Sequence, residues 1–594
     1  MTPNTRSAAL VLAAFFVAGL VVFGNAGHLR TTVATAPEPA PEVAPGGETT
    51  EGGSVVAHDY MVAAANPLAA EAGRAVLADG GSAADAAVAV QMMLNLVEPQ
   101  SSGIGGGAFL LYWDASEQTL TTLDGRERAP LAADETYWLG PDGEPVAWWD
   151  AVVGGRSVGV PGTLKLLETL HTQFGTKPWA DLLQPTIAKA DAGFAISPRL
   201  AESIAAAQDK KLDLFDTAKA YFFNSDGTPK AAGTLLKNPA FAETLRRIAA
   251  EGSAPFYTGS IAADIVAAVK TDINPGILTL DDMAAYTVVQ REPVCVPYRG
   301  DTVCGMGPPT SGGLTVGQIL GMLSTYDLPA LGPSVEGWHL YIEAAKLAYA
   351  DRALYMADSD YVPMPTYGLI DATYLAERAA LIDPDSAMEM AEPGVPPKDH
   401  ATLWAPDTQV ERPGTSHFVI VDANGDMVSM TTTIETGFGS RVMTNGFLLN
   451  NELTDFARAP EVDGRPVANR VEGGKRPRSS MSPTIVLRDG TPVLLVGSPG
   501  GSRIINYVAN ALVAILDWGM DPQGALDMGH VVNRNGPTEL EDGTGALAHA
   551  DGLVALGHAV KTGALESGLH AILIQDGRLI GAADPRREGV AVGE

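Results

Sequence analysis

Residues 413–433 read Pro-Gly-Thr-Ser-His-Phe-Val-Ile-Val-Asp-Ala-Asn-Gly-Asp-Met-Val-Ser-Met-Thr-Thr-Thr and combine two signals. From Phe418 to Met430, apolar residues alternate on both sides of a turn-forming Ala-Asn-Gly-Asp sequence (423–426), a pattern typical of a β-hairpin. Thr415 follows a glycine directly before the first strand. The segment therefore predicts an antiparallel strand pair with a hydroxyl side chain at its entrance.

The same hairpin pattern recurs twice towards the C-terminus. Residues 484–496 surround an Asp-Gly turn at 489–490, and residues 571–581 surround another at 576–577. The three pairs predict an antiparallel sheet in this region. Because helical patterns elsewhere can cover both faces of such a sheet, we expect the α+β class and an αββα sandwich, in which helices cover two antiparallel sheets.

The N-terminal part of the chain is rich in predicted helices. Asn66-Pro67 is a helix start, and Ser82 with Asp85 three residues later resembles a capping box, so residues 66–97 predict two helices. Further helical patterns cover residues 163–174, 241–251, 261–270, 336–356 and 509–516.

Thr415 is a candidate nucleophile for self-cleavage. Glycine adopts backbone geometry that other residues cannot, so the Thr415 hydroxyl could attack the Gly414 carbonyl and form an ester that water then cleaves. The product is an N-terminal threonine, whose α-amine has a pKa of about 7.7–8.0 and can act as base for its own hydroxyl. By spacing alone, Gly-Thr before a strand is also an ordinary loop end.

A glycine-rich loop follows the second predicted hairpin. The sequence Gly-Ser-Pro-Gly-Gly-Ser at 497–502 precedes a helical run that begins near Ile505. Consecutive glycines expose backbone N–H groups that can stabilise a tetrahedral oxyanion. A phosphate-binding loop is the rival interpretation, but no Gly-Lys-Ser/Thr sequence follows.

Composition limits the class of protein. The chain has 594 residues, 18% charged and 46% hydrophobic, and a formal net charge of −31. A chain this long predicts two domains or one large layered domain. The negative charge argues against nucleic acid as a partner, because nucleic-acid binding depends on clustered Lys and Arg.

The N-terminus predicts export. Arg6 precedes an apolar run from Ala8 to Phe23, so residues 1–26 are either a removed signal peptide or a retained membrane anchor. Residues 27–54 are rich in Pro, Glu, Gly and Thr and predict a disordered linker. A periplasmic or extracellular location follows, with membrane anchoring as the variant.

The two cysteines, Cys295 and Cys304, lie in two short predicted strands around a Tyr-Arg-Gly-Asp turn (298–301). An oxidising compartment favours a cross-strand disulfide. A metal site would need further ligands at close spacing, and the sequence offers none nearby.

The chain resembles γ-glutamyltranspeptidases (γ-glutamyltransferases) from about Met61 to Pro585. The resemblance rests on six motifs: Asp-Gly-Arg-Glu-Arg-Ala-Pro (124–130), Pro-Pro-Thr-Ser-Gly-Gly (308–313), Gly-Thr-Ser-His (414–417), Leu-Leu-Asn-Asn (448–451), Lys-Arg-Pro-Arg-Ser-Ser-Met-Ser-Pro (475–483) and Gly497 to Arg503. It implies an N-terminal-nucleophile hydrolase that cleaves itself before Thr415. The large subunit (55–414) and the small catalytic subunit (415–594) would remain associated as a heterodimer.

The resemblance also implies roles for individual residues. Catalysis would use Thr415 as nucleophile, Thr433 as the second threonine beside it, and Gly500 and Gly501 as the oxyanion hole. The substrate's α-carboxylate would be bound by Arg126, Ser479 and Ser480, and its α-ammonium by Glu452 and Asp455. His417 is interpreted as structural, and no cofactor or metal is expected.

Two features depart from the family. Glu435 stands where typical members carry asparagine, so it either grips the ammonium or turns outward to Arg441. The segment 457–474 lacks the gating aromatic of the lid loop and looks shortened, which would admit larger amides and let water compete with amine acceptors.

The expected activity is hydrolysis and transfer of γ-glutamyl groups from glutathione and related amides to water, amino acids or peptides. A cephalosporin or glutaryl acylase of the same fold is the nearest alternative, against which the acidic residues Glu452 and Asp455 argue. A non-catalytic envelope protein is the second alternative, against which the intact pair Thr415 and Thr433 argues.

Overall fold

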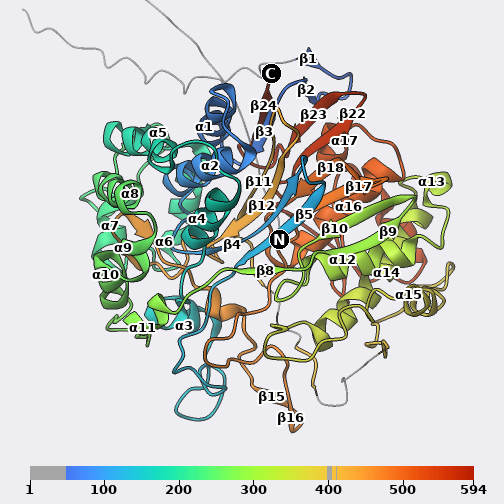
Figure 1. Ribbon diagram of the computed structural model, residues 1–594. Helices are drawn as coiled ribbons and strands as arrows, with labels where there is room; N and C mark the ends of the chain where they lie inside the picture. The colour runs from blue at the N-terminus through green and yellow to red at the C-terminus, as the bar shows by residue number, and fades with distance from the viewer. Residues whose placement is uncertain (1–47, 398–403, 408, 410) are drawn as a thin grey trace, which may run out of the picture. The chain divides into compact units, whose positions relative to one another are not determined.

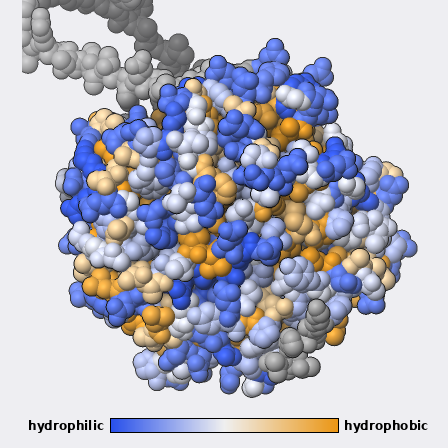
Figure 2. Space-filling view, viewed as in Figure 1, coloured by the Kyte–Doolittle hydropathy of each residue, from blue (hydrophilic) through white to orange (hydrophobic). Residues whose placement is uncertain are grey.

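The computed structural model describes residues 48–397, 404–407, 409 and 411–594. The predicted signal peptide or anchor (1–26) and most of the predicted linker lie outside the described residues. Hydrophilic residues predominate on the face shown in Figure 2, with hydrophobic residues scattered among them, in keeping with the net charge of −31. Within the described part of the chain, no helix combines the length and apolar character needed to cross a membrane.

Two antiparallel sheets form the centre of the fold (Figure 1). The seven-stranded sheet has the order β24 (Val590–Gly593), β3 (Met61–Ala64), β11 (Ser416–Val421), β12 (Met427–Thr433), β4 (Gly107–Asp114), β5 (Thr119–Gly125) and β8 (Val289–Arg291). The eight-stranded sheet has the order β1 (Glu48–Thr49), β2 (Val55–Ala57), β23 (Arg578–Ala583), β22 (His570–Gln575), β18 (Thr491–Gly497), β17 (Thr484–Arg488), β10 (Asp301–Gly305) and β9 (Val294–Tyr298).

Helices cover the outer face of each sheet, which confirms the predicted αββα sandwich (Figure 1). One layer packs α1, α2 and α4 on the seven-stranded sheet, with α5 and α8 outside α2. The other packs α12 and α16 on the eight-stranded sheet, with α14 against α12. Their bounds are α1 Pro67–Ala78, α2 Ala83–Val97, α4 Thr163–Phe174, α5 Trp179–Ala192, α8 Pro239–Glu251, α12 Gly312–Leu323, α14 Val335–Tyr355 and α16 Ile504–Leu516.

Local sequence signals explain where the first helices begin. The Asn66 side chain accepts a hydrogen bond from the Leu68 N–H (3.0 Å) at the start of α1. At α2, the Ser82 hydroxyl accepts from the Asp85 N–H (3.2 Å), and the Asp85 carboxylate accepts from the Ser82 N–H (2.9 Å). The predicted capping box is therefore present.

The central hairpin buries both of its faces. In β11, Phe418 and Ile420 belong to the core beneath α1 and α2, whereas Val419 and Val421 belong to the core between the two sheets. Successive side chains of a strand point to opposite faces, so alternate residues of β11 pack in two different hydrophobic cores.

The three predicted hairpins are confirmed, but they belong to two sheets rather than one. β11–β12 lies in the seven-stranded sheet, whereas β17–β18 and β22–β23 lie in the eight-stranded sheet. Strands β4 and β5 were not predicted, because the nearly continuous apolar run of β4 lacks the alternation that identifies a half-buried strand.

The predicted linker ends earlier than residue 54. β1 (Glu48–Thr49) pairs with β2, and the buried Ser54 lies between them. Thr50 donates a hydrogen bond to Asp521 (2.7 Å), and Ser54 donates to the same carboxylate. Tertiary partners thus order residues 48–54, whose composition alone indicates disorder.

Strands β9 and β10 place Cys295 opposite Cys304, and a disulfide joins them. The turn between the strands contains Arg299 and Gly300, both with positive φ. The predicted cross-strand disulfide is therefore present in the structure.

Candidate active site

Thr415 and Thr433 face each other where β11 begins and β12 ends. The Thr415 hydroxyl donates to the Thr433 hydroxyl oxygen (3.1 Å), which also accepts from the Glu435 N–H (2.8 Å). The Thr415 N–H donates to the Ser101 carbonyl (3.1 Å), and its own carbonyl accepts from Arg587 (2.8 Å). The hairpin register therefore brings the two predicted threonines together and fixes the backbone of the first.

The backbone is strained at the bond expected to be cleaved. Thr415 has φ of 82° and Glu435 has φ of 76°, values that are uncommon for residues other than glycine, above all for a β-branched residue. A Cβ at Gly414 would lie 1.6 Å from the Glu435 carbonyl oxygen. Only glycine fits before Thr415, and such strain costs on the order of 1–3 kcal/mol per residue.

Of the two predicted oxyanion glycines, only Gly501 is placed at the cavity that contains Thr415. Gly500 and Gly501 have φ of 138° and 61°. Gly501 lines the same small cavity as Thr415, whereas Gly500 is not among the lining residues. A Cβ at Gly501 would lie 2.6 Å from the Arg412 carbonyl carbon, so the segment before Thr415 passes directly over it.

A buried group of carboxylates surrounds Arg126 on another wall of the cavity. The guanidinium donates to Asp455 (2.6 Å) and to Glu452, and Glu127 lies 3.8 Å away. It also donates to the carbonyls of residues 477 (3.2 Å) and 478 (2.7 Å). The residue predicted to bind the substrate's carboxylate is thus paired with the residues predicted to bind its ammonium.

Carboxyl groups outnumber the one guanidinium in this group. Burial raises the pKa of Glu435 well above its usual value, and Asp455 and Glu452 raise it further. Burial likewise raises the pKa of Asp455 and of Glu452, although Arg126 opposes both shifts. One carboxylate oxygen of each of these three residues is buried without a hydrogen-bond partner among the described residues.

The position of Glu435 decides between its two predicted orientations. Its carboxylate accepts from the Asn451 side chain and lines the cavity with Thr415. Arg441 instead donates to the carbonyls of residues 210 and 439. Glu435 therefore faces the site, and the outward ion pair with Arg441 is absent among the described residues.

The predicted serines form a further part of the cavity lining. Ser479 and Ser480 both line the cavity, and Ser311 of the Pro-Pro-Thr-Ser-Gly-Gly motif donates to the Ser479 carbonyl (2.7 Å). Arg352 of α14 donates to Ser480 (2.7 Å) and to Ser311 (2.8 Å). The motif at 308–313 and helix α14 thus hold the loop of Ser479 and Ser480 in place.

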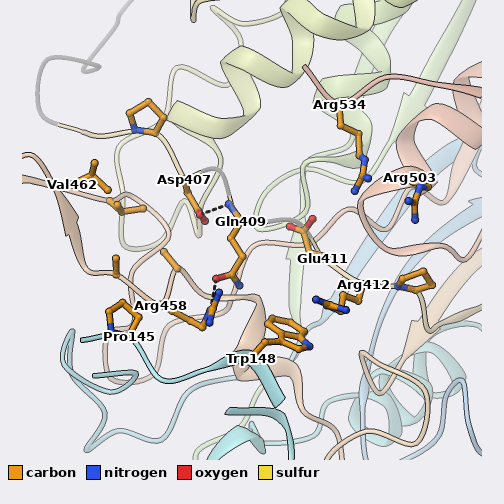
Figure 3. Close-up of a pocket in the computed structure, with 15 residues that line it drawn as sticks. Pro145, Trp148, Asp407, Gln409, Glu411, Arg412, Arg458, Val462, Arg503 and Arg534 are labelled. Carbon is orange, nitrogen blue, oxygen red and sulfur yellow. Dashed lines mark hydrogen bonds between the residues drawn. The ribbon is translucent and has the colours of Figure 1, made fainter. Parts of the chain in front are cut away.

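The segment before Thr415 divides the site into an inner and an outer space. The inner cavity, with a free volume of about 20 Å³, contains Thr415, the acidic wall and the serines. The outer pocket, of about 620 Å³, shares only Glu411 and Arg412 with it. Figure 3 shows the outer pocket, where Arg412 lies beside Trp148.

The segment 457–474 forms one edge of the outer pocket. It contains a short hairpin of β15 (Glu461–Val462) and β16 (Arg465–Pro466), and Val462 and Val467 line the pocket. No aromatic residue occurs in this segment. This edge of the outer pocket is therefore a small hairpin that carries no gating aromatic residue.

Several residues that contact the site were not predicted. These are Ser101, Glu127, Arg352, Glu411 and Arg587. Arg352 is one position on a long helix and Glu411 lies in an irregular segment, so neither carries a spacing signal. His417, interpreted from the sequence as structural, has a buried ring that bonds Thr431 (2.9 Å) and packs on Gly497.

A group of potential metal ligands lies outside the site. His339, Glu343 and His558 are buried together, and no such group was expected from the sequence. Lys346 donates to Glu343 (2.9 Å), and His339 bonds His558 (2.7 Å) and the Asp383 carbonyl (2.8 Å). The Lys346 ammonium and the hydrogen bonds of the histidine rings therefore explain why these side chains are buried together, without a metal ion.

Comparison with known proteins decides the family. The family model described as Gamma-glutamyltranspeptidase matches residues 69–594. The chain belongs to the gamma-glutamyltranspeptidase family. Among its relatives is a glutathione hydrolase proenzyme of Bacillus subtilis (strain 168), 38% identical over 553 residues that cover 91% of this chain and 92% of the relative.

Acylases are also similar to this chain. An acylase ACY 1 proenzyme of Pseudomonas sp. (strain V22) is 35% identical to this chain. The matched region covers 94% of this chain and 97% of the acylase. The crystal structure of a cephalosporin acylase from Bacillus halodurans superposes with a TM-score of 0.80 at 28% identity, over 94% of this chain and 99% of that one. Family membership alone therefore leaves the acyl group to be decided by the site.

Proposed function

We propose that the mature protein hydrolyses and transfers γ-glutamyl groups from glutathione-like amides through an ester on Thr415. The proposal rests on Glu435, Glu452 and Asp455, which line one cavity. Each has one buried carboxylate oxygen without a hydrogen-bond partner among the described residues. A substrate α-ammonium has three N–H donors and the opposite charge. The acidic wall thus suits an acyl group that carries an amine.

Maturation would begin with attack of the Thr415 hydroxyl on the Gly414 carbonyl. The peptide C–N bond breaks as the new C–O bond forms, so the chain shifts from nitrogen to oxygen. Water then cleaves the ester, leaving a carboxylate on Gly414 and a free amine on Thr415. The strained φ of Thr415 favours this step, because cleavage releases the strain.

The mature residue then combines nucleophile and base. Its amine accepts the proton of its own hydroxyl as the oxygen attacks the γ-carbonyl of the substrate. The N–H groups of Gly500 and Gly501 would stabilise the oxyanion, and Thr433, which accepts a hydrogen bond from the Thr415 hydroxyl (3.1 Å), would orient that hydroxyl. The amine returns the proton to the leaving amine, and water or an amine acceptor then releases the glutamyl group.

The likeness to acylases supports a second candidate, hydrolysis of glutaryl or cephalosporin amides by the same nucleophile. An acyl group without an amine would leave the acidic wall uncompensated, and this favours the first proposal. We further propose that the two chains form a heterodimer in the periplasm or outside the cell, consistent with the apolar segment near the N-terminus.

The test compares γ-glutamyl and glutaryl anilides, which differ only in the α-amino group. We expect the mature protein to prefer the γ-glutamyl anilide by at least about 100-fold in kcat/KM, the size of about 2.7 kcal/mol. Equal or better turnover of the glutaryl anilide would establish the acylase. Thr415→Ala, which should remain one uncleaved chain without activity, serves as the control.

A further inference from the structure

A third pocket borders the segment that precedes Thr415. It has a volume of about 820 Å³, and Pro413 and Gly414 are among the residues that line it. Ser101, whose carbonyl accepts from the Thr415 N–H (3.1 Å), lines it as well. Of the residues around the inner cavity, only Arg412 also lines this pocket. The pocket therefore reaches the bond expected to be cleaved without sharing the acidic wall.

Basic side chains predominate around this third pocket, which we call the basic pocket. Seven arginine and lysine residues line it against three glutamates, although the whole chain has a formal net charge of −31. Three of the seven form ion pairs with glutamates. The other four have no ion-pair partner among the described residues: Lys210, Arg412, Arg441 and Arg587. The basic pocket thus concentrates unpaired positive charge in an acidic protein.

Two of these unpaired cations, Arg441 and Arg587, are buried. Each donates to two backbone carbonyls, and Arg587 reaches that of Thr415 (2.8 Å). Burial lowers the pKa of each guanidinium to about 10, so both are charged at neutral pH. A buried charge without a counter-ion is unfavourable. An anion that entered the basic pocket would therefore be stabilised by both.

A buried amide adds hydrogen-bonding groups to the basic pocket. Gln100 lines the pocket, and both polar atoms of its side chain are buried without a partner among the described residues. This amide can donate to a carboxylate or accept from a peptide N–H. The Trp149 ring, also in the lining, lies 5.6 Å from the Arg441 guanidinium and 5.9 Å from the Lys210 ammonium. The pocket thus offers charge and hydrogen bonds to one ligand.

The inner cavity and the basic pocket carry opposite charge. Four carboxyl groups and two arginines line the inner cavity, whereas cations exceed carboxyl groups in the basic pocket. A γ-glutamyl peptide has a matching polarity, because its ammonium lies on the acyl side of the amide and the C-terminal carboxylate lies on the leaving side. Complementary charge of this kind fixes the orientation of a ligand.

The segment before Thr415 keeps these two spaces apart in the uncleaved chain. Its residue Arg412 lines both, and the backbone of residues 411–412 covers Gly501, where a Cβ would be 2.6–2.7 Å from it. Cleavage gives the segment a free end at Gly414, and its withdrawal would join the spaces at Thr415. A substrate amide at Thr415 would then place its acyl group in the inner cavity and its leaving group in the basic pocket.

We propose that Arg441, Lys210 and Gln100 form a leaving-group subsite that binds the carboxylate of the departing amino acid or peptide. The inference rests on the proposed function and deepens it, because it assigns the part of the substrate beyond the γ-glutamyl amide. Since transfer reverses the cleavage step, an acceptor that carries a carboxylate would use the same subsite. Arg441 is the specificity-determining residue, because it is the buried cation of the three.

The first test compares γ-glutamyl-glycylglycine with its C-terminal amide, followed by the release of glutamate. The two donors form the same ester on Thr415, so their kcat/KM values differ only through the leaving group. We expect wild-type protein to prefer the free carboxylate by about ten-fold in kcat/KM, the effect of a charge-assisted contact. Equal values would overturn the inference, and would result if the new carboxylate of Gly414 kept the subsite filled.

Variants of the basic pocket should reduce this preference. Arg441→Gln should bring the ratio of the two kcat/KM values close to one, because the buried charge is removed. Lys210→Gln, at an exposed position, should lower the ratio about two-fold. A ratio within one variant does not depend on how much of the protein is folded and cleaved. If Arg441→Gln does not mature, Lys210→Gln decides, and an unchanged ratio there refutes the subsite.

Lys211→Gln is the matched control for surface charge. Lys211 is the next residue after Lys210 and is also exposed, but its ammonium lies 3.8 Å from Asp150 and it does not line the basic pocket. This variant removes the same charge from the same loop and should leave the ratio unchanged. An equal decrease in Lys211→Gln and Lys210→Gln would show a general effect of net charge and would contradict the proposal.

A second test does not depend on maturation and uses the uncleaved Thr415→Ala chain. N-acetylglycine carries a carboxylate, and N-acetylglycinamide has the same shape without the charge. We expect N-acetylglycine to raise Tm relative to the amide, with chloride added to equalise ionic strength. Adding Arg441→Gln should abolish the difference. No rise in the Thr415→Ala chain, or a rise that persists without Arg441, would exclude carboxylate binding in the basic pocket.

The two levels of the proposal can fail separately. If the wild-type protein turns over neither peptide while N-acetylglycine binds through Arg441, the proposed function fails and the carboxylate site stands. If the wild type turns over both peptides equally, the γ-glutamyl activity stands and the leaving-group subsite fails.

Discussion

At the scale of single residues, the site depends on two hydroxyls and one acidic wall. Thr415 and Thr433 meet at 3.1 Å because they occupy facing ends of one hairpin. Glu435 enters the site because the chain turns sharply after β12, with φ of 76° at that residue. Each of these residues can be changed without removing a large part of the core.

Thr433→Val should slow both self-cleavage and turnover. Valine preserves the side-chain shape but removes the oxygen that accepts from Thr415 and from the Glu435 N–H. We expect kcat to fall about 10- to 100-fold, the effect of about one lost hydrogen bond in the transition state. Processing is followed on denaturing gels and turnover with the γ-glutamyl anilide.

The control for that variant is the neighbouring threonine. The Thr432 hydroxyl is buried without a partner among the described residues, so Thr432→Val should leave kcat unchanged and maintain or raise stability. Equal losses in both variants would mean that Thr433 acts through packing alone.

Glu435→Asn should weaken binding of substrates that carry an amine. The variant removes one of three carboxyl groups that have an unpartnered oxygen in the cavity, so KM for the γ-glutamyl anilide should rise about ten-fold. KM for the glutaryl anilide should stay constant or fall, because that acyl group has no ammonium for Glu435 to bind. An unchanged γ-glutamyl KM would exclude Glu435 from ammonium binding.

At the scale of elements, strand ends and loops between strands assemble the site on a rigid sandwich. Thr415 precedes β11, Thr433 ends β12, and the serine loop precedes β17. The strand pair β9–β10 leads into the motif that holds this loop, since Ser311 contacts the carbonyl of residue 479. The disulfide lies in this pair, away from the reacting groups.

Replacing Cys295 and Cys304 by serine should lower stability without changing kcat/KM. The bond closes a loop with a sequence separation of 9, for which chain entropy predicts a contribution of about 2–3 kcal/mol. Chemical denaturation with and without reductant measures it. Reduced wild-type protein should match the variant; a loss of activity in either would place the strand pair in the catalytic machinery.

At the scale of the whole molecule, the segments before and after Thr415 are interleaved in both sheets. β11 pairs with β3, β12 with β4 and β24 with β3 in one sheet. β17 pairs with β10 and β23 with β2 in the other. Cleavage at one bond therefore leaves two chains that share both sheets and their cores.

The cleaved protein should elute from native gel filtration as one peak that contains both chains. Separation would break five strand pairings and expose apolar faces that are now buried, an unfavourable change at about 25 cal/mol per Å². The two chains should separate only in denaturant. Two independent peaks under native conditions would contradict the shared sandwich.

Buried histidines should make the protein sensitive to mild acid. Burial lowers the pKa of His530 to about 3 and that of His570 to about 4. Because the unfolded value is about 6.5, their contribution to stability is complete above that pH. This contribution to stability decreases as the pH falls from 6.5 towards 4, because the unfolded chain binds protons in this range and the folded chain does not.

His530→Gln tests this acid branch. His530 bonds the Ser567 hydroxyl (2.7 Å), and a glutamine amide can still donate to that oxygen. The free energy of unfolding should depend less on pH between 6.5 and 4, by up to about 1.4 kcal/mol per pH unit for one proton. An unchanged slope in urea denaturation would show that His530 does not titrate on unfolding.

The sequence by itself determined what depends on local patterns. Period-two alternation identified the three hairpins, the Ser82 and Asp85 pair located the start of α2, and glycine before Thr415 marked that residue as a candidate nucleophile. These features follow from neighbouring residues, because strand pleating, helix capping and turn geometry are local properties of the backbone. The six motifs added the family and the acidic wall.

Only the tertiary structure decided how these parts share space and charge. It distributed the hairpins over two sheets, ordered residues 48–54 through Asp521, and turned Glu435 into the site. It also brought Arg352 and Glu411 together from positions 59 residues apart in sequence. No local pattern specifies such a pair, because its energy arises from burial and charge contacts that exist only after the sheets and helices have packed.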